Sequence, residues 1–404
     1  MSFDTLAVLL FWIPLGILGY HWVLFPAVLW IWSRVQPRRY IDVVDPDALR
    51  VSLVMAVYNE ESIIADKVRN CLDLDYSVDR TEILIGSDSS TDRTEEIIRS
   101  FGDARIRLLR FEPQAGKTVV QNRLLQEASG DVVLCTDADS MLTRDSLRLM
   151  LAHMRDPRVA VVNPRYVRVN REGSPAEGFY DKWESKVKEF EGRLGAMVGC
   201  NAYANMIRKE YATPIPDDTI LDDFVLGIRP FRSRMDVVCE PKAIVTTLAE
   251  SESVEFSRKT RISGGNLQAL IRCFCLLSPR YGRKAWVYFS HKVLRMVVPL
   301  LLLMMLAGSA IEARHPFFAV LLLLQVAGYI TIPLVFASSG RFRRLLIPQY
   351  YLLMNVGLVI GYWRYLFRRE QYWRKTPRTP FASPHAADEE SKRRETVVAE
   401  TRPR

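Results

Sequence analysis

The chain has 404 residues, of which 49% are hydrophobic and 25% are charged, and its formal net charge at pH 7 is +9. This composition excludes a disordered chain, a collagen-like repeat and a small disulfide scaffold, and the length allows two or three domains. Long runs without any charged residue lie toward both ends of the chain. A basic chain with such runs is expected to bind anionic lipid or phosphorylated small molecules, and no nucleic acid.

The first uncharged run extends from Leu6 to Trp32. It is longer than the apolar core of a signal peptide and no basic region precedes it, so residues 1–35 are predicted to form a retained transmembrane helix. Three arginines follow the run, at positions 34, 38 and 39. Basic residues beside a span favour the cytoplasmic side, so the segment that follows is expected in the cytoplasm.

Residues 36–262 are predicted to form one domain, and within it the segment from Arg50 to Ala249 alternates short β-rich runs with helical patterns. Strands are predicted at Val51–Val57, Glu82–Gly86, Arg105–Arg110 and Asp131–Cys135, and helices at Glu60–Leu72, Thr91–Phe101 and Lys117–Ala128. The alternation predicts an α/β domain with a mostly parallel sheet and helices on both faces. In such sheets ligands bind beyond the carboxyl ends of the strands, where this chain has its polar clusters.

Residues 263–292 contain two amphipathic patterns, which predict interfacial helices that would hold the active site against lipid. An ordinary amphipathic core helix is the alternative. Residues 293–367 are predicted to form three transmembrane helices. The apolar runs behind this prediction are Met296–Ile311, Phe317–Ser338 and Leu345–Trp363.

The predicted topology is a multi-pass protein of the inner membrane with its catalytic segment in the cytoplasm. The basic loop at residues 341–344 should be cytoplasmic as well. Residues 368–404 are basic and polar and are expected to be disordered. The side of this tail stays open, because three spans would place it outside while the basic residues after the last run favour the inside.

Asp137 and Asp139 follow an apolar strand and are separated by one alanine. Residues i and i+2 of an extended segment point the same way, so the two carboxylates can share one hard cation. Mg²⁺ or Mn²⁺ held there can bridge a diphosphate and neutralise the charge that develops on a leaving nucleotide. An isolated D-x-D is usually a surface loop, and the apolar strand before this one favours the metal site.

Asp88 ends a neighbouring strand, and Lys117 begins a helix. The Asp88 carboxylate either accepts a hydrogen bond from a nucleobase N–H or caps the next helix, a task that Thr91 or Asp92 could perform alone. A lysine at a helix N-terminus can bind a phosphate, and a solvated lysine is the alternative.

Asp222 and Asp223 are adjacent, so their side chains point apart and only one need enter a site. A carboxylate there can take the proton from an attacking hydroxyl, or it can cap the helix that follows. The cationic run at residues 258–261 contains Arg258 and Arg261. It is interpreted either as a membrane-surface patch or as a clamp for a pyrophosphate.

The order of these motifs resembles family 2 glycosyltransferases of GT-A fold. The motifs are Val57-Tyr58-Asn59-Glu60, Ser87 to Asp92, Gly116-Lys117 with Asn122, Thr136 to Ser140, and Asp222-Asp223 with Arg229. Cellulose, chitin and hyaluronan synthases and many bacterial envelope polysaccharide glycosyltransferases belong to this family. The resemblance covers about residues 48–295. It implies inverting transfer from a nucleotide sugar, usually a UDP-sugar.

The resemblance also implies roles for single residues. Nucleotide-sugar-binding residues would be Val57, Asn59, Glu60, Asp88, Lys117, Asp137, Arg258 and Arg261. Asp88 would bind uracil, and Asp137 with Asp139 would meet the diphosphate and a Mg²⁺ or Mn²⁺ ion. Asp223 matches the general base at the end of the family's T-E-D motif, with Asp222 as the neighbour that orients it or meets the acceptor. The acceptor end of the site would contain Gly199, Cys200 and Asn201.

Two positions depart from the family pattern. The glutamate of T-E-D is Asp222 here, which is a conservative change. The Q-x-x-R-W motif of processive synthases appears as Arg258 to Ile262, where Arg261 keeps the arginine but the glutamine and the tryptophan are absent. That tryptophan supplies a flat face for an acceptor sugar, so its absence weakens the expectation of processive polymerisation.

The expected function is inverting transfer of a sugar from a UDP-sugar to a lipid-linked or growing envelope polysaccharide acceptor at the membrane. A polyprenyl-phosphate sugar synthase is the alternative. Its acceptor phosphate needs no base, so Asp223 would then matter little. An alternative of another class is a polysaccharide-translocating membrane protein without catalysis of its own. The predicted spans contain no intramembrane charge pair that would mark a translocation path.

Overall fold

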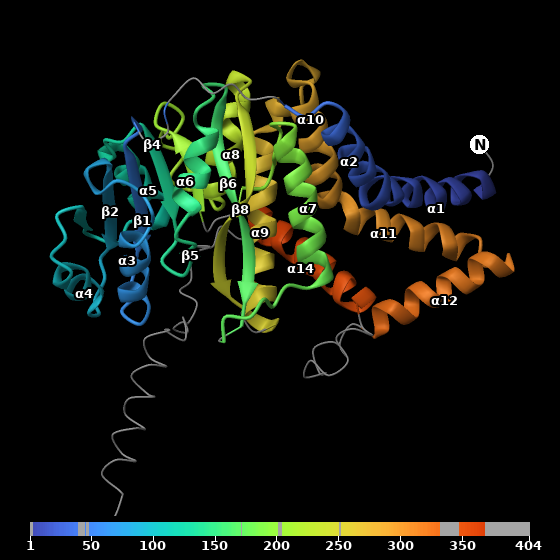
Figure 1. Ribbon diagram of the computed structural model, residues 1–404. Coiled ribbons are helices and arrows are strands. Elements are labelled where there is room, and N and C mark those ends of the chain that lie inside the picture. The colour runs from blue at the N-terminus through green and yellow to red at the C-terminus, as the bar shows by residue number, and fades with distance from the viewer. Residues whose placement is uncertain are drawn as a thin grey trace, which may run out of the picture.

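The computed structural model describes residues 3–38, 45, 48–170, 172–200, 204–249, 252–331 and 347–367. At its centre lies an eight-stranded sheet with the order β3-β2-β1-β4-β7-β6-β8-β5. The strands are β1 (Val51–Val57), β2 (Thr81–Asp88), β3 (Ile106–Phe111), β4 (Val132–Thr136), β5 (Met141–Leu142), β6 (Val159–Val169), β7 (Ala204–Arg208) and β8 (Asp236–Leu248). Figure 1 shows helices packed around this sheet and long helices that project from one side.

The first four strands of the chain pair in parallel, as the alternation of strands and helices predicts. β7 runs antiparallel to its neighbours β4 and β6, and β5 runs antiparallel to β8. β6 and β8 pair in parallel, so all strands except β5 and β7 share one direction. The sheet is therefore mixed, and the expectation of a mostly parallel sheet holds for its larger part.

Both faces of the sheet are buried. Successive side chains of a strand point to opposite sides, so each strand contributes to two cores. Val54 of β1 joins one apolar core, whereas Leu53 and Met55 join the other. Residues of α5 (Lys117–Glu127), α7 (Phe179–Arg193) and α8 (Asp222–Ile228) contribute to the first core. Residues of α3 (Ile64–Leu72), α4 (Thr94–Ser100) and α6 (Ser146–His153) contribute to the second. A strand covered on both faces has no polar side, which explains the continuous apolar run of β4.

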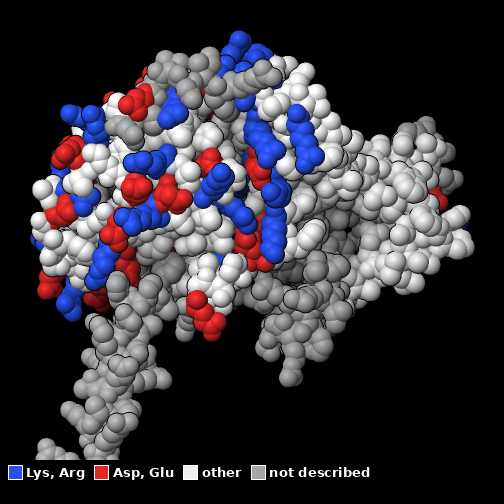
Figure 2. Space-filling view, viewed as in Figure 1, with Lys and Arg blue, Asp and Glu red and all other residues white. Residues whose placement is uncertain are grey.

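Two helical stretches, residues 5–35 and 283–311, are long and apolar enough to cross a membrane. The first comprises α1 (Phe3–Gly19), the π-helical turn η1 (Tyr20–Leu24) and α2 (Phe25–Val35), and the second comprises α10 (Arg283–Val287), the π-helical turn η7 (Tyr288–Val293) and α11 (Leu294–Ile311). α1 and α11 pack against each other, and α12 (Pro316–Ile330) is apolar but shorter. In Figure 2 the described surface of this part is almost free of charged side chains, unlike the surface of the sheet domain.

The predicted spans fall on these helices and on α14 (Ile347–Phe367). The end of the second C-terminal run, the basic loop at residues 341–344 and the tail from residue 368 lie outside the described residues. The crossing of a membrane, the number of spans and the side of each loop stay predictions.

A continuous helix, α9 (Glu252–Arg272), contains the boundary that was expected between residues 262 and 263. It packs against α14, where a Cβ atom at Gly361 would lie only 2.3 Å from the carbonyl oxygen of Thr260. Ile271 in its last turn has an exposed fraction of 58%, and Phe274 in the 3-10 turn that follows, η5 (Phe274–Leu277), has one of 66%. The part of the predicted interfacial segment that begins at residue 263 is thus the second half of a helix that packs on α14, with an apolar edge left open.

A buried carboxylate connects three parts of the chain at the base of the projecting helices. Asp236 opens β8 and is fully buried. One carboxylate oxygen lies 2.7 Å from Nε of Arg38, which follows α2, and the other lies 2.8 Å from Nζ of Lys284 in α10. Because Lys284 is also buried, its charge depends on this partner.

The substitution Asp236→Ala is expected to lower the free energy of unfolding by about 3–5 kcal/mol, because it leaves the buried Lys284 ammonium without a counter-charge. Thermal unfolding of the purified chain, followed by tryptophan fluorescence, measures the effect. Glu96→Ala is the control, because the ion pair of Glu96 with Arg93 is exposed and contributes little. Equal unfolding midpoints for the two variants would contradict the assigned role of Asp236.

Candidate active site

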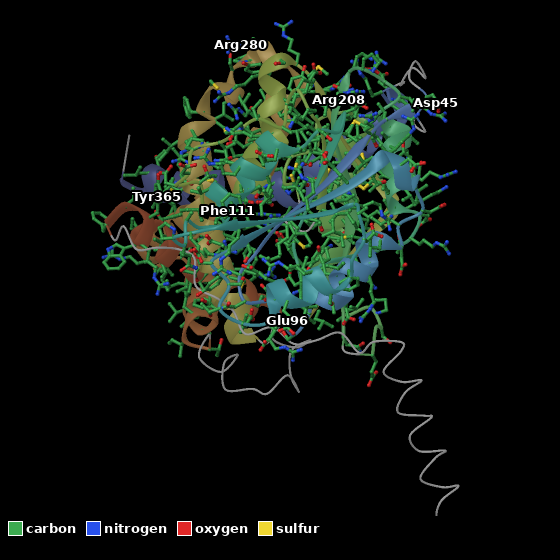
Figure 3. All side chains as sticks on the ribbon, turned by 90° about the vertical axis from the view of Figure 1, so that its left-hand side faces the viewer. Asp45, Glu96, Phe111, Arg208, Arg280 and Tyr365 are labelled. Atoms are coloured by element: carbon green, nitrogen blue, oxygen red, sulfur yellow. The ribbon has the colours of Figure 1, made fainter. Side chains whose placement is uncertain are left out.

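The polar motifs that follow β1, β2 and β4 meet at one edge of the sheet. β1 pairs in parallel with both β2 and β4, so the carboxyl ends of the three strands lie side by side (Figure 1). The edge is extended by β3, whose last residue, Phe111, is labelled in Figure 3. The carbonyl oxygen of Phe111 accepts a hydrogen bond of 2.8 Å from Oγ of Ser89. The sheet itself therefore brings together side chains that are up to about eighty positions apart in the sequence.

Asn59 and Glu60 hold the loop after β1 against the loop after β2. Asn59 has a φ of 54°, a left-handed conformation that asparagine tolerates better than most residues. Its Oδ1 accepts a hydrogen bond of 2.7 Å from the backbone N–H of Thr91, and the N–H of Glu60 donates to Oγ1 of Thr94 at 2.7 Å. Val57 is a buried residue of the sheet core. These contacts give the three residues a clear structural task, and their contact with a nucleotide sugar stays a prediction.

Asp88 is buried and shapes the start of α5. Its two carboxylate oxygens accept hydrogen bonds from the backbone N–H groups of Ala115, at 2.7 Å, and Gly116, at 2.9 Å. Gly116 has a φ of 93°, which favours glycine, and it directly precedes the first residue of the helix, Lys117. Asp88 thus positions Lys117, and the binding of uracil by Asp88 stays a prediction.

Lys117 lies between two carboxylates. Its Nζ is 2.9 Å from Oδ1 of Asp137 and 3.2 Å from Oδ2 of Asp222. Burial alone would lower the pKa of Lys117, but the two carboxylates outweigh it and raise this pKa, so the side chain is an ammonium ion. Burial raises the pKa of Asp137, and the Lys117 charge opposes that shift. The lysine therefore keeps two neighbouring acidic groups together at the edge of the sheet.

The segment that contains Asp137 and Asp139 is a turn and not an extended strand. β4 ends at Thr136, and the backbone N–H and the Oγ of Ser140 both donate to the carbonyl oxygen of Asp137, at 3.3 and 2.8 Å. Asp137 and Asp139 are therefore not positions i and i+2 of a strand, and the prediction of an extended segment at this point is wrong. Their proximity comes from the turn instead.

Lys67 of α3 also holds this turn in place, a role that was not predicted from the sequence. Its buried Nζ donates to Oγ1 of Thr136 at 2.8 Å and to the carbonyl oxygen of Ser140 at 2.6 Å. A signal was present, because Lys67 stands in the apolar stripe that α3 forms with Ile64, Val68 and Cys71. A lysine in such a stripe must find buried acceptors, and the end of β4 provides them.

The oxygen ligands of Asp137 and Asp139 suit a hard cation such as Mg²⁺ or Mn²⁺. In the part of the chain that the structure describes, no group of three or more His, Cys, Asp or Glu side chains is arranged to hold a metal ion. A cation at this turn would therefore need further oxygen ligands, such as those of a diphosphate.

Asp222 and Asp223 open α8 and have different surroundings. Asp222 is directed to Lys117, whereas Asp223 lies within electrostatic range of the Cys200 thiol. Burial, followed by the charge of Asp222, raises the pKa of Asp223 to about 7, although Lys117 acts in the opposite direction. A carboxylate with this pKa can accept a proton near neutral pH.

The predicted acceptor residues adjoin α8. The thiol of Cys200 packs on Gly227, where a Cβ atom would lie 1.9 Å from the sulfur. Burial raises the pKa of Cys200 to about 12, so it remains a thiol. Gly199 has a φ of 88° and borders Lys292. Asn201 lies outside the described residues.

Arg258 and Arg261 lie on α9, which is not one of the elements that form the strand edge. One turn before them, Glu255 of the same helix pairs with Arg168 of β6 at 3.1 Å and with Lys259 at 3.1 Å. Their binding of a pyrophosphate stays a prediction.

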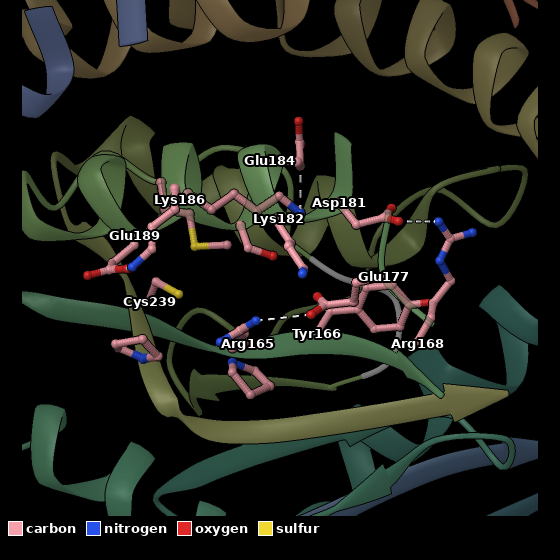
Figure 4. A pocket seen from close by; sticks show the side chains of 15 residues that line it. Arg165, Tyr166, Arg168, Glu177, Asp181, Lys182, Glu184, Lys186, Glu189 and Cys239 are labelled. Atoms are coloured by element: carbon pink, nitrogen blue, oxygen red, sulfur yellow. Dashed lines mark hydrogen bonds and ion pairs between the residues drawn. The ribbon is translucent and has the colours of Figure 1, made fainter. Parts of the chain in front are cut away.

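A cavity of about 260 Å³ lies between α7 and the strands β6 and β8 (Figure 4). Ion pairs join acidic and basic side chains of its wall, such as Arg165 with Glu177 at 3.1 Å, and Arg168 with Asp181. Among the described residues that line it, none is a predicted site residue. Lys188 of α7 lines the cavity and also approaches Gly199, so the cavity borders one of the predicted acceptor residues.

Three comparisons with known proteins agree with this geometry. Residues 52–212 match the family model of glycosyl transferase family 2. The chain is 25% identical over 298 residues to the beta-monoglucosyldiacylglycerol synthase of Trichormus variabilis, an alignment that covers 70% of this chain and 63% of the relative. It is also 25% identical over 237 residues to the poly-beta-1,6-N-acetyl-D-glucosamine synthase of Staphylococcus epidermidis, with 55% of this chain and 56% of the relative covered. The chain thus spans less than two thirds of the length of these relatives.

The fold is similar to that of a solved structure, the mannosyltransferase PcManGT from Pyrobaculum calidifontis in complex with GDP-Man and Mn²⁺. The TM-score is 0.69, and the alignment covers 91% of this chain and 99% of the other at 19% identity. At that identity the similarity shows the fold, which is the GT-A arrangement. The match of residues 52–212, together with the ordered motifs at the strand edge, assigns this segment of the chain to glycosyl transferase family 2.

Proposed function

We propose that the chain transfers a sugar, with inversion, from a UDP-sugar to a lipid or glycan acceptor at the cytoplasmic face of the inner membrane. The observation that carries this proposal is the bridge from Lys117 to Asp137 and Asp222. It joins the turn of the D-x-D motif to the helix that carries Asp223. A donor site and a candidate base are thereby held in one rigid unit.

The donor diphosphate would lie against Lys117 and the N-terminus of α5. Both favour an anion, the ammonium ion through its charge and the helix through its free backbone N–H groups. Asp137 and Asp139 would hold Mg²⁺ or Mn²⁺, which neutralises charge on the leaving nucleotide diphosphate when it is bound. The solved structure with the same fold contains Mn²⁺ and a nucleotide sugar, which supports this assignment.

Asp223 would activate the acceptor. In an inverting displacement the acceptor hydroxyl attacks the anomeric carbon opposite the nucleotide, and its proton must leave as the new bond forms. The Asp223 carboxylate would take this proton, and its raised pKa makes it a stronger base than an ordinary aspartate. Asp222 would not touch the acceptor, because it is paired with Lys117.

The apolar helical stretches support an acceptor in or on a membrane. They pack on the sheet domain beside Gly199 and α7, on the acceptor side of the site. One relative is named as a synthase of a glucosyl diacylglycerol, and another as a synthase of a polysaccharide. A lipid acceptor suits the exposed apolar surface of these helices better than a soluble one does.

A donor and acceptor panel tests the proposed function. The purified chain is incubated with UDP-glucose, UDP-N-acetylglucosamine or GDP-mannose, with Mg²⁺ or Mn²⁺, and with vesicles of membrane lipid extract. Release of the nucleoside diphosphate and radioactivity in the lipid phase are measured. We expect transfer from a UDP-sugar that depends on the vesicles. Preference for GDP-mannose would overturn the donor assignment, and nucleotide release that is independent of the vesicles, with no radioactivity in the lipid phase, would overturn the lipid acceptor.

The pH dependence of transfer tests the base. Because Asp223 acts in its deprotonated form, kcat/KM should rise with pH up to about 7 and level off above it. Asp222→Asn removes a negative neighbour that raises the pKa of Asp223, so the rise should move to lower pH. Asp223→Asn should lower kcat about 10²–10⁴-fold and abolish this rise. Asp218→Asn, an exposed neighbour in the same loop, is the control and should change neither.

An unshifted pH profile for Asp222→Asn would show that the pH dependence does not arise from Asp223. Near wild-type turnover of Asp223→Asn would indicate an acceptor that needs no base, such as a polyprenyl phosphate.

Removal of the metal ion tests the role of the D-x-D turn. EDTA should abolish transfer, and added Mn²⁺ or Mg²⁺ should restore it, because the leaving diphosphate then regains its counter-charge. Asp139→Asn should lose transfer without a change in the unfolding midpoint. Asp145→Asn, an exposed carboxylate a few residues further on, is the matched control. Full activity in EDTA would remove the metal ion from the mechanism.

A further inference from the structure

Lys292 reaches the acceptor end of the site from an apolar helix. It belongs to η7, within the helical stretch of residues 283–311. A Cβ atom at Gly199 would lie 2.5 Å from Nζ and 2.8 Å from Cε of Lys292, so the lysine lies directly on the backbone of this glycine. Gly199 also has a left-handed φ of 88°. Both facts favour glycine at position 199, and the missing Cβ atom leaves room for the ammonium group.

A second lysine and the candidate base surround the same place. The Cβ position of Gly199 is 3.6 Å from Cε of Lys188 in α7. Nζ of Lys292 is 5.7 Å from the ring centre of Phe224, the residue after Asp223. Asp223, Lys188 and Lys292 all lie close enough to the Cys200 thiol to act on it electrostatically.

The carboxylates near Lys292 are already occupied. Glu184 lies 2.8 Å from Nη2 of Arg295, and Glu191 lies 2.5 Å from Nδ1 of His291. Glu191 also accepts a hydrogen bond of 3.1 Å from the backbone N–H of Val198. Lys188 has a distant pair with Glu184, at 4.0 Å. Within the described part of the chain, no ion pair or hydrogen bond is formed by the ammonium group of Lys292.

The π-helical turn explains how this helix supplies two polar residues to the sheet domain. A π turn adds one residue to the helix and is frequent at functional sites. In η7, His291 is directed to Glu191 of α7, and the next residue, Lys292, lies on Gly199. The helix thus anchors itself through His291 and leaves Lys292 for another partner.

We propose that Lys292, with Lys188 beside it, binds an anionic group of the acceptor, a phosphate or a carboxylate, next to the oxygen that attacks the sugar. This inference rests on the proposed function and narrows its acceptor to an anionic lipid. A partly buried ammonium group without a counter-charge is costly, and an anion that carries the nucleophile would remove that cost. Lys292 binds and positions the acceptor.

In the reaction, the bond from the anomeric carbon to the diphosphate oxygen breaks and a bond to the acceptor oxygen forms. Where the nucleophile is a hydroxyl beside a lipid phosphate, its proton passes to Asp223. Where the phosphate itself attacks, no proton is transferred. The ammonium group of Lys292 remains protonated in both cases, so the two lipid classes share one recognition chemistry.

The test compares Lys292→Met, Lys292→Arg and the control Lys186→Met with the wild-type chain. Lys186 is an exposed lysine of α7 that pairs with Glu189. Vesicles contain phosphatidylglycerol, a polyprenyl phosphate or neutral diacylglycerol. KM for each acceptor, KM for the donor, and hydrolysis of the donor without acceptor are measured, together with lipid binding by native mass spectrometry.

For Lys292→Met we expect a KM for the anionic acceptor that is raised about tenfold or more, because a charge-assisted hydrogen bond is lost. Donor KM and donor hydrolysis should stay unchanged, and Lys292→Arg should recover most of the loss. Lys186→Met should behave like the wild type. Use of phosphatidylglycerol or of polyprenyl phosphate decides which anionic lipid is the acceptor.

Three results would overturn the inference. They are an unchanged KM in Lys292→Met, a loss of donor hydrolysis that accompanies the loss of transfer, and efficient use of diacylglycerol by wild type and variant alike. If the wild-type chain releases no nucleotide from any donor, the proposed function fails instead. Lipid binding then decides by itself, because Lys292→Met should still bind less anionic lipid than the wild type does.

Discussion

The ammonium group of Lys117 lies between the carboxylates of Asp137 and Asp222, and the geometry of the active site depends on this bridge. Two carboxylates at such close quarters repel each other, and burial makes the repulsion stronger. The lysine removes this repulsion. It joins α5 and the turn after β4 to α8, which lies more than eighty positions further along the chain. The proposed donor site, with an acidic turn on one side and a candidate base on the other, depends on this central charge.

The bridge itself depends on supports behind it. Asp88 receives the two backbone N–H groups that precede Lys117, so the end of β2 determines where α5 begins. Lys67 is fully buried and holds the turn of Asp137 through hydrogen bonds to Thr136 and Ser140. Each support is a buried charge satisfied by neighbouring polar groups, which makes the edge of the sheet rigid.

The helices at the two ends of the chain form one unit with the sheet domain. Oγ of Ser290 lies 2.8 Å from the hydroxyl group of Tyr20, and the carbonyl oxygen of Ser290 lies 2.8 Å from Nδ1 of His21. These residues lie in η1 and η7. The two helices therefore contact each other where each of them contains a π-helical turn with one extra residue. The same region meets α7 through His291. The proposed acceptor end of the site would therefore be built partly by apolar helices.

The α/β alternation could be predicted from the sequence, because strands covered on both faces appear as continuous apolar runs and the helices between them appear as amphipathic patterns. The order of the motifs, which resembles that of family 2 glycosyltransferases, could also be predicted from the sequence, since each of these polar clusters follows a strand. The contacts that these residues make depend on the tertiary structure and could not be predicted from the sequence. Asp88 and Lys67 act through contacts with distant segments, and no local pattern shows the turn at Asp137. The proximity of Lys292 to Gly199, ninety-three positions apart, arises from helix packing on the sheet domain, which sequence periodicity does not encode.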